Sequence, residues 1–182
     1  KYPQHYRKAF VNNKIILDLD GVITDIDSLI DETLESYGVS EDYSSWLTTD
    51  TKDPEALKLF SNPVFWKNLK PFEDAWYQVN YWFGRGFDVH ILTARRSEAS
   101  VNATAAWLDD WKINTMTPQF SAFNEKYKIA QEINPVYMVE DNPSEVKILL
   151  EHGVNCFLRK AWYNKSYWEE LPTIDNLYDI DL

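Results

Sequence analysis

"KIILDLDGVITD", residues 14–25, combines a short apolar run with three aspartates. Its apolar part, residues 14–20, is typical of a strand that is buried on both faces of a parallel sheet. Residues two apart in a strand face the same side, so Asp18 and Asp20 are expected to point into one place. Like charges raise each other's pKa there, and the pair therefore needs a nearby positive charge.

The rest of the chain alternates apolar strands with helical patterns. Predicted strands follow at residues 87–93, 136–141 and 154–158. Predicted helices cover residues 28–39, 71–86, 100–111, 125–133 and 143–153. This alternation indicates a Rossmann-like α/β fold, in which right-handed crossovers place helices on both faces of a parallel sheet. Ligands of such sheets bind beyond the carboxyl ends of the strands, so the residues at those ends are the first candidates for a site.

Residues 26–70 differ from the rest and are predicted to form a small helical cap inserted after the first strand. Much of this segment mixes Ser, Thr, Asp and Pro with scattered aromatic residues, and residues 53–60 have the Asp and Pro of a short helix start. The core domain is then expected to comprise residues 1–25 and 71–160. The aromatic and acidic tail, residues 161–182, is expected to pack on this core.

Composition argues against several classes of function. The chain has 182 residues and a formal net charge of −11, which counts against a surface for extended nucleic acid and against attraction to anionic membranes. No apolar run approaches the roughly 18 residues of a membrane-spanning helix. The one cysteine, Cys156, allows no internal disulfide, so a reducing compartment and a cytoplasmic location are expected. Nothing in the sequence indicates an oligomeric state.

The predicted strand ends carry the residues with the most chemistry. These residues are Asp18, Asp20, Thr93, Ala94, Arg95, Glu140 and Asp141. Carboxylates that converge at one edge of a sheet repel each other, and a hard divalent cation removes this repulsion. Ligand sets made only of oxygen favour Mg²⁺ over zinc, and the three histidines are scattered along the chain. We therefore predict a Mg²⁺ site at this edge.

The first aspartate pair could also belong to a calcium loop or to a simple turn. An EF-hand calcium loop that starts at Asp18 is excluded, because it would place Val22 and Ile23 where an oxygen ligand and a glycine are required. Aspartates after strands also cap turns and helices, which would account for Asp18 and Asp20 without a metal. This capping role stays open for the pair alone, but it does not account for all three strand ends together.

Four segments resemble the sequence motifs of the haloacid dehalogenase (HAD) superfamily. Residues 18–25, DLDGVITD, resemble its first motif, hydrophobic residues followed by DxDGxxxD, and residues 91–95, ILTAR, are similar to the second. Residues 124–133, NEKYKIAQEI, supply the lysine of the third motif, and residues 138–146, MVEDNPSEV, resemble the acidic pair of the fourth. The order and spacing agree over residues 14–158. The resemblance implies the HAD fold and a phosphohydrolase activity.

The resemblance implies a catalytic role for the matching residues. Asp18 would attack phosphorus and form an aspartyl phosphate, and Asp20 would protonate the leaving oxygen and then activate water. Thr93 would hydrogen-bond a phosphate oxygen. A lysine would pair with the phosphate and with Asp18; Lys126 fits the pattern, and Lys128 is the alternative. The dehalogenase branch has a Tyr-like or apolar residue at the position of Asp20, so this aspartate argues for phosphate chemistry.

The resemblance also implies the metal ligands. Mg²⁺ would bridge Asp18, the backbone carbonyl of Asp20 and Asp141. Glu140 is the first member of the acidic pair, where relatives often carry Asp or Gly, and its contribution to the metal site is left open. Asp25 would brace the loop after the first motif.

The substrate is expected to be a small phosphorylated molecule. Residues 62–75, NPVFWKNLKPFEDA, resemble the 5′(3′)-deoxyribonucleotidase family, in which cap aromatics stack on the base. Phe65 and Trp66 are the candidates for binding a (deoxy)nucleoside monophosphate, together with Ala94 and Arg95. The same aromatic pair would otherwise only pack the cap onto the core.

The sequence leaves two alternative functions open. Residues 93–108, TARRSEASVNATAAWL, also resemble polynucleotide 3′-phosphatase domains, which implies a nucleic-acid end as substrate, although the acidic balance counts against it. A catalytically silent binding module would instead keep the fold and use the aromatic tail, residues 161–182, to contact a partner. The presence of every residue that the mechanism needs favours an enzyme.

Overall fold

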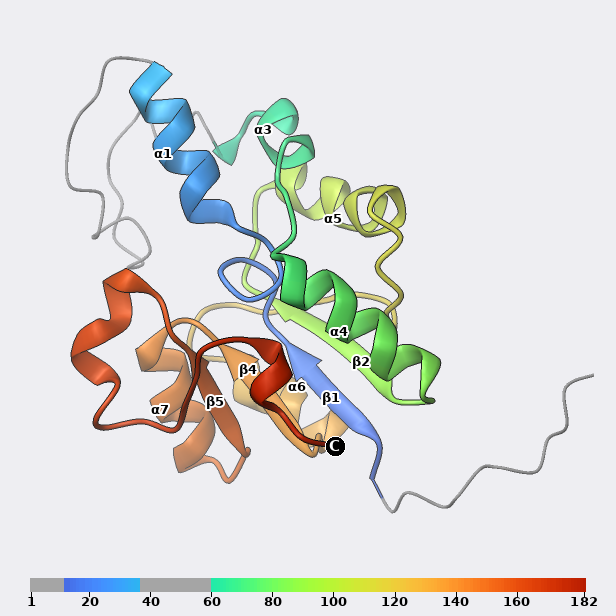
Figure 1. The fold of residues 1–182 in the computed structure, drawn as a ribbon, viewed down its shortest axis with the longest axis vertical. Coiled ribbons are helices and arrows are strands. Elements are labelled where there is room, and N and C mark those ends of the chain that lie inside the picture. The colour runs from blue at the N-terminus through green and yellow to red at the C-terminus, as the bar shows by residue number, and fades with distance from the viewer. Residues whose placement is uncertain (1–11, 37–59) are drawn as a thin grey trace, which may run out of the picture.

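A parallel sheet surrounded by helices is formed by residues 12–36 and 60–182, the part of the chain that the computed structural model describes (Figure 1). The sheet has six strands in the order β3-β2-β1-β4-β5-β6, and every neighbouring pair is parallel. The strands are β1 (Lys14–Leu17), β2 (Asp88–Thr93), β3 (Gln119–Phe120), β4 (Tyr137–Glu140), β5 (Cys156–Arg159) and β6 (Thr173–Ile174). This confirms the predicted α/β fold. The short strands β3 and β6 were not predicted, and the helix predicted at residues 53–60 lies outside the described residues except for its last one.

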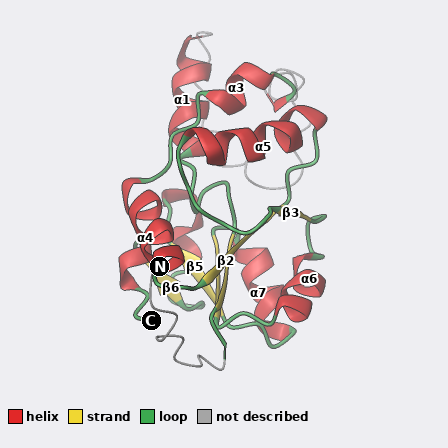
Figure 2. Ribbon diagram, turned by 90° about the vertical axis from the view of Figure 1, so that its right-hand side faces the viewer, coloured by secondary structure: helices red, strands yellow, loops and turns green. Residues whose placement is uncertain are grey.

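Helices cover both faces of the sheet and the edge at which the strands end (Figure 2). They are α1 (Ile26–Ser36), α3 (Pro63–Lys67), α4 (Glu73–Gly84), α5 (Glu98–Asp110), α6 (Lys126–Ile133) and α7 (Pro143–Glu151), with the 3₁₀ helices η2 (Trp162–Tyr167) and η3 (Leu177–Asp179). Helix α4 lies on one face of the sheet, and α6 and α7 lie on the other. None of the helices in the described part of the chain is long and apolar enough to cross a membrane.

Strand β1 is buried on both faces, which explains its uninterrupted apolar sequence. Ile15 and Leu17 belong to the hydrophobic cluster that includes Val79 of α4. Ile16 belongs to the second cluster, which includes Leu149 of α7. Successive strand residues point to opposite faces, so this division follows from the two-residue period of the strand. The strand is thereby fixed in the middle of the sheet, with its carboxyl end at the edge where the site is expected.

Side-chain caps set the starts of two helices close to the strand ends. Asn142 caps α7, because its Oδ1 accepts the backbone N–H of Ser144 at 2.9 Å. Ser97 caps α5 by accepting the backbone N–H of Ser100 at 3.1 Å, so α5 starts at Glu98, before the predicted start at residue 100. These helix starts turn the chain sharply after β4 and β2. The residues between each strand and its helix therefore stay at the edge of the sheet.

Asp25 sets the start of α1. Its Oδ1 accepts the backbone N–H of Ser28 at 3.2 Å, and its Oδ2 accepts the hydroxyl of the same serine at 2.8 Å. The helix therefore begins at Ile26 and not at residue 28. Asp25 thus braces the loop after β1.

Among the described residues, the helices α1, α3 and α5 form a layer beyond the carboxyl ends of the strands (Figures 1 and 2). Helices α1 and α3 come from the insert predicted at residues 26–70, whereas α5 comes from the part that was assigned to the core. Helix α3 packs against α5. Trp107 of α5 donates its indole N–H to the carbonyl of Leu69 at 2.9 Å. The helical layer over the strand ends therefore combines the insert with part of the expected core.

The C-terminal residues complete the sheet and one hydrophobic cluster. Strand β6 pairs with β5, and Ile174 and Leu177 are buried among the residues that contact α4. Arg159 at the end of β5 forms two contacts with Asp74 of α4, at 2.7 and 2.8 Å. Asp74 also accepts the backbone N–H of Leu177 at 2.8 Å. This buried ion pair ties the C-terminal segment to α4.

Candidate active site

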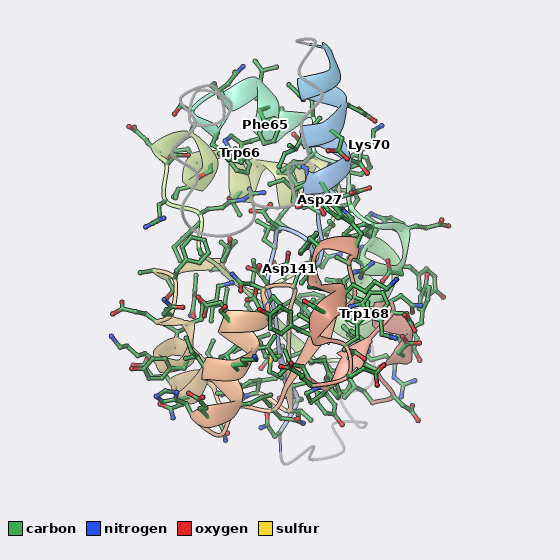
Figure 3. The ribbon with its side chains drawn as sticks, turned by 90° about the vertical axis from the view of Figure 1, so that its left-hand side faces the viewer. Asp27, Phe65, Trp66, Lys70, Asp141 and Trp168 are labelled. Carbon is green, nitrogen blue, oxygen red and sulfur yellow. The ribbon has the colours of Figure 1, made fainter. Side chains whose placement is uncertain are left out.

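Three buried carboxylates meet where β1 and β4 end. Asp18 follows β1, Glu140 is the last residue of β4 and Asp141 follows it; each offers an oxygen within 4.8 Å of the others. The backbone N–H of Asp18 donates to the carbonyl of Val139 at 2.9 Å, so the pairing of β1 with β4 continues up to the cluster. Figure 3 shows Asp141 between the sheet and the helical layer. The structure thus brings together the carboxylates of the first and fourth motifs.

Lys126 lies inside this acidic cluster. It is the first residue of α6 and only 1% exposed, and its Nζ is 2.8 Å from Asp18 Oδ1 and 2.6 Å from Glu140 Oε2. Lys128, the alternative, has a half-exposed side chain that pairs with Glu125 at 2.7 Å on the surface. Buried carboxylates are tolerated only with a paired charge, which Lys126 supplies. The geometry therefore favours Lys126 as the lysine of the site.

Burial dominates the electrostatics of the cluster. It raises the pKa of Asp18 well above the ordinary value, and the Glu140 charge adds to this while Lys126 opposes it. Burial likewise raises the pKa of Glu140 and of Asp141 to about 7. Although burial by itself lowers the pKa of Lys126, the carboxylates of Asp18 and Glu140 raise it above its ordinary value. The carboxylates therefore hold Lys126 in its charged form, and together they would carry more negative charge than it balances if all three were ionised.

The residues present fit a hard divalent cation. The cluster has three carboxylates and one lysine, which pairs with Asp18 and Glu140, so in its fully ionised form it keeps a surplus of two negative charges. The ligand atoms are all oxygen, which suits Mg²⁺, and no described cysteine or histidine belongs to the cluster. A bound Mg²⁺ would offset the surplus charge and remove the repulsion that raises these pKa values.

Gly21 allows the loop after β1 to pass directly against Asp141. Its φ of +77° lies in the left-handed region, and an added Cβ would be 2.2 Å from Asp141 Oδ2. No other residue type meets both requirements without displacing that carboxylate. The glycine of the first motif is therefore needed so that the ends of β1 and β4 can share one site.

Arg95 binds Asp20 from the end of β2. Its Nε is 2.8 Å from Asp20 Oδ2 and its Nη2 is 2.6 Å from Oδ1, which also accepts the hydroxyl of Thr24 at 2.9 Å. Its Nη1 donates to Thr104 at 3.0 Å, and the guanidinium lies 4.4 Å from the ring centroid of Trp66. Arg95 was predicted to contact the substrate. In this structure it is 6% exposed and its donors are directed at Asp20 and at α5.

Phe65 and Trp66 are packed into the helical layer. Each is 4% exposed, and their rings pack edge to face with the ring centroids 5.1 Å apart. Trp66 also donates its indole N–H to the carbonyl of Phe60 at 2.9 Å. Almost no ring surface is left open to a nucleobase. Stacking on a base stays a prediction, and it would require this packing to open.

Thr93 and Ala94 complete the end of β2. Thr93 is buried, and its hydroxyl oxygen accepts the backbone N–H of Arg95 at 3.3 Å. Ala94 is partly buried beside it. Because β2 is the neighbour of β1, both residues lie at the same edge of the sheet as Asp18. Contacts of Thr93 and Ala94 with a phosphate remain a prediction.

Tyr163 and Asn164 also reach the site, and sequence reasoning did not identify them. The hydroxyl of Tyr163 donates to Asp141 Oδ2, and Asn164 Nδ2 donates to the Asp141 carbonyl at 2.9 Å. Both follow β5, the neighbour of β4. Their position just after a strand, at the edge where Asp18 and Asp141 lie, is the sequence signal that could have found them.

No family model and no curated protein sequence matches this chain. Solved structures do match its fold. A haloacid dehalogenase-like hydrolase from Streptococcus pneumoniae has a TM-score of 0.63 and 14% identity over 92% of this chain and 96% of that one. CbbY from Rhodobacter sphaeroides, solved in complex with phosphate, has a TM-score of 0.62 and 15% identity over 94% of this chain and 100% of that one.

A chain of the Pnkp1/Rnl/Hen1 RNA repair complex also matches, with a TM-score of 0.52 and 15% identity over 82% of this chain but only 43% of that one. At these identities the likeness shows the fold. This chain has the fold of HAD-superfamily hydrolases, with a buried acidic cluster at the carboxyl edge of its sheet.

Proposed function

We propose that this protein is a Mg²⁺-dependent phosphohydrolase that cleaves a phosphate monoester through an aspartyl phosphate on Asp18. The observation that carries the proposal is the buried set of Asp18, Lys126, Glu140 and Asp141. The order of the four motifs supports it. The fold likeness to a haloacid dehalogenase-like hydrolase and to CbbY, which was solved in complex with phosphate, supports it as well.

In the first half-reaction an oxygen of Asp18 attacks the phosphorus, and the bond between phosphorus and the ester oxygen breaks. Lys126, 2.8 Å from Asp18, offsets the negative charge of the nucleophile and of the incoming phosphate. Asp20 donates a proton to the leaving oxygen. Asp18, Asp141 and the backbone carbonyl of Asp20, with Glu140 beside them, would hold Mg²⁺, which would supply further positive charge at the phosphate.

In the second half-reaction the aspartyl phosphate is hydrolysed. Asp20, now ionised, takes a proton from a water molecule, whose oxygen attacks the phosphorus while the bond to Asp18 breaks. Inorganic phosphate leaves and Asp18 is restored. Thr93 would hydrogen-bond a phosphate oxygen in both steps.

The Asp20–Arg95 pair has a consequence for the acid step. Both oxygens of Asp20 accept hydrogen bonds from Arg95, which suits the ionised form of this carboxyl. Protonated Asp20, which must give a proton to the leaving oxygen, can keep only part of these hydrogen bonds with Arg95. The acid step therefore includes a rearrangement of the pair, and Arg95 acts on the acid and not on the phosphate.

The proposed substrate is a small phosphorylated molecule, most favourably a (deoxy)nucleoside monophosphate. The resemblance of residues 62–75 to deoxyribonucleotidases supports this choice. Because Phe65 and Trp66 are covered in this structure, they would contact a base only after the helical layer moves. If the helical layer does not move, other apolar side chains would have to hold the base.

A second candidate is the 3′-phosphate end of a polynucleotide. The fold likeness to a chain of an RNA repair complex favours it, together with the resemblance of residues 93–108. The net charge of −11 opposes an extended nucleic-acid surface, so only a short end would be held.

Phosphate release in the presence of Mg²⁺ tests the proposal. The panel consists of deoxy- and ribonucleoside 5′- and 3′-monophosphates, a 3′-phosphorylated oligonucleotide, sugar phosphates and an aryl phosphate. Asp18→Asn should lower turnover by about a thousandfold or more and keep the fold, because it removes the nucleophile and little volume. Asp109→Asn, a change on the exposed face of α5, is the control and should be without effect.

The results separate the candidates. Preference for deoxynucleotides supports the nucleotidase, and preference for the oligonucleotide supports the polynucleotide phosphatase. Turnover by Asp18→Asn at the wild-type rate contradicts the nucleophile assignment. No release from any member of the panel favours the silent binding module.

A further inference from the structure

The segment after β5 brings two side chains to Asp141. Strand β5 lies next to β4, so the chain that leaves β5 passes the carboxyl end of β4. The first turn of η2 then carries Tyr163 and Asn164 to that place. Neither residue belongs to the four motifs of residues 14–158.

Asn164 anchors this segment with all of its hydrogen-bonding groups. It is 0% exposed, and its Nδ2 donates to the carbonyls of Asp141 and Arg159, each at 2.9 Å. Its Oδ1 accepts the backbone N–H of Ala161 at 2.9 Å and the indole N–H of Trp168 at 2.8 Å. An amide side chain offers two donor hydrogens and two acceptor lone pairs, so Asn164 is saturated. The backbone at Asp141 is thereby fixed to the ends of β5 and η2.

Tyr163 contacts the side chain of the same aspartate. Its hydroxyl donates to Oδ2 of Asp141. A Cβ added at Gly21 would lie 2.2 Å from that oxygen and 2.9 Å from the Tyr163 hydroxyl, so the loop after β1 passes closely against both groups. The carboxylate is therefore confined between Tyr163 and the loop after β1, while its backbone is held by Asn164.

We propose that Tyr163 is a positioning residue of the metal site, which holds the Asp141 carboxylate in the orientation that binds a divalent cation. This inference rests on the proposed function, in which Asp141 is a metal ligand. A carboxylate rotates about single bonds, and a hydrogen bond to one oxygen removes much of that freedom before the metal arrives. Groups that hydrogen-bond a metal ligand typically contribute about 10–100-fold to metal affinity.

The hydroxyl of Tyr163 has little to do with holding the segment in place. Asn164 already fixes the backbone with four hydrogen bonds. Removing the hydroxyl should therefore weaken metal binding and leave the fold intact. A merely structural role would give the opposite pattern, a loss of thermal stability with unchanged metal affinity.

The test compares Tyr163→Phe with Tyr167→Phe. Tyr167 is a matched control, because it lies on the same 3₁₀ helix and its ring contacts Lys147 at 4.7 Å, away from the acidic cluster. Isothermal titration with Mg²⁺ and with Mn²⁺ gives the dissociation constants without substrate. Thermal unfolding in EDTA reports the fold of each variant, and the Mg²⁺ dependence of phosphate release gives a second measure of affinity.

We expect Tyr163→Phe to raise the dissociation constant for Mg²⁺ by about tenfold or more, and Tyr167→Phe to change it by less than about twofold. At saturating Mg²⁺, Tyr163→Phe should recover most of its turnover. Equal or tighter Mg²⁺ binding by a folded Tyr163→Phe would overturn the inference while leaving the proposed function intact. If the wild-type protein releases phosphate but binds neither ion, the metal part of the proposed function fails, and this inference fails with it.

Discussion

Arg95 holds Asp20 through two parallel hydrogen bonds, Nε to Oδ2 at 2.8 Å and Nη2 to Oδ1 at 2.6 Å. The two residues come from the ends of β2 and β1, so the pair joins neighbouring strands at the edge of the sheet. The side chain of Arg95 is 2% exposed and that of Asp20 is 20% exposed, which places the pair largely out of water. Its geometry depends on the planar guanidinium, which lysine cannot reproduce.

Arg95→Lys should therefore impair both stability and turnover. We expect the free energy of unfolding to fall by about 2–3 kcal/mol, because one of two hydrogen bonds to a partly buried carboxylate and the contact with Trp66 are lost. The turnover number should fall as well, since Asp20 is no longer oriented. Urea unfolding and phosphate release measure the two effects. The control is Arg96→Lys on the exposed neighbour; wild-type behaviour of Arg95→Lys would show that the pair is dispensable.

Lys126→Met should be far more damaging than Lys128→Met. Removing Lys126 leaves Asp18 and Glu140 without their paired charge, which for a buried pair costs about 3–5 kcal/mol. Lys128 forms an exposed pair with Glu125, and such pairs contribute about 0–1 kcal/mol. Urea unfolding at pH 7 and phosphate release check both variants. Equal losses in the two would contradict the placement of Lys126.

Asp27 should make the protein less stable as the pH rises. Burial, followed by the charges of Asp25 and Asp31, raises the pKa of Asp27 from 3.8 to about 7. The folded protein then binds a proton at this residue between pH 4 and 7 that the unfolded chain has released, so the contribution of Asp27 to stability is lost as the pH rises through this window. Figure 3 shows the residue at the base of α1, on the side of the helical layer that faces Asp141.

The test of this pH dependence is Asp27→Asn. The variant should gain about 1–2 kcal/mol over the wild type at pH 8 and little at pH 5, as measured by urea unfolding. Glu32→Gln, which alters an exposed residue of the same helix that is not among the causes of the shift, serves as the control. A difference between Asp27→Asn and the wild type that does not grow with pH would contradict the shift in pKa.

Mg²⁺ should stabilise the folded protein through Asp141. At a concentration a hundred times its dissociation constant, a ligand of the folded state adds about 2.7 kcal/mol to the free energy of unfolding. Thermal unfolding with Mg²⁺ and with EDTA should therefore differ by several degrees in the wild type and by almost nothing in Asp141→Asn. The same midpoint in both buffers for the wild type would argue against a metal at this cluster.

The two lysines show where sequence reasoning reached its limit. Both fit a motif at the start of a helix, and they are two residues apart. Successive residues of a helix turn by about 100°, so these two side chains leave α6 in nearly opposite directions. The exact first residue of the helix decides which of them meets Asp18. That boundary depends on how α6 packs, which the sequence pattern does not reveal.

The residues of the helical layer were harder to interpret. Phe65 and Trp66 were predicted to face a base, and Arg95 was predicted to face the substrate. Their surroundings depend on the contact between α3 and α5, which are distant in sequence. In the structure the ring of Trp66 contacts Phe65 and the guanidinium of Arg95, and Arg95 binds Asp20. Residue type alone could not distinguish packing from binding at these positions.

The sequence was sufficient to predict the parallel sheet and the burial of its first strand on both faces, because strand burial and the alternation of strands with helices are local patterns. It also determined which carboxylates stand at the strand ends, since each follows its own strand directly. The packed structure was needed to show that Lys126 enters the acidic cluster, that Arg95 binds Asp20, and that Tyr163 and Asn164 reach Asp141. These contacts join residues far apart along the chain, and they exist only once the neighbouring strands and the helical layer have packed together.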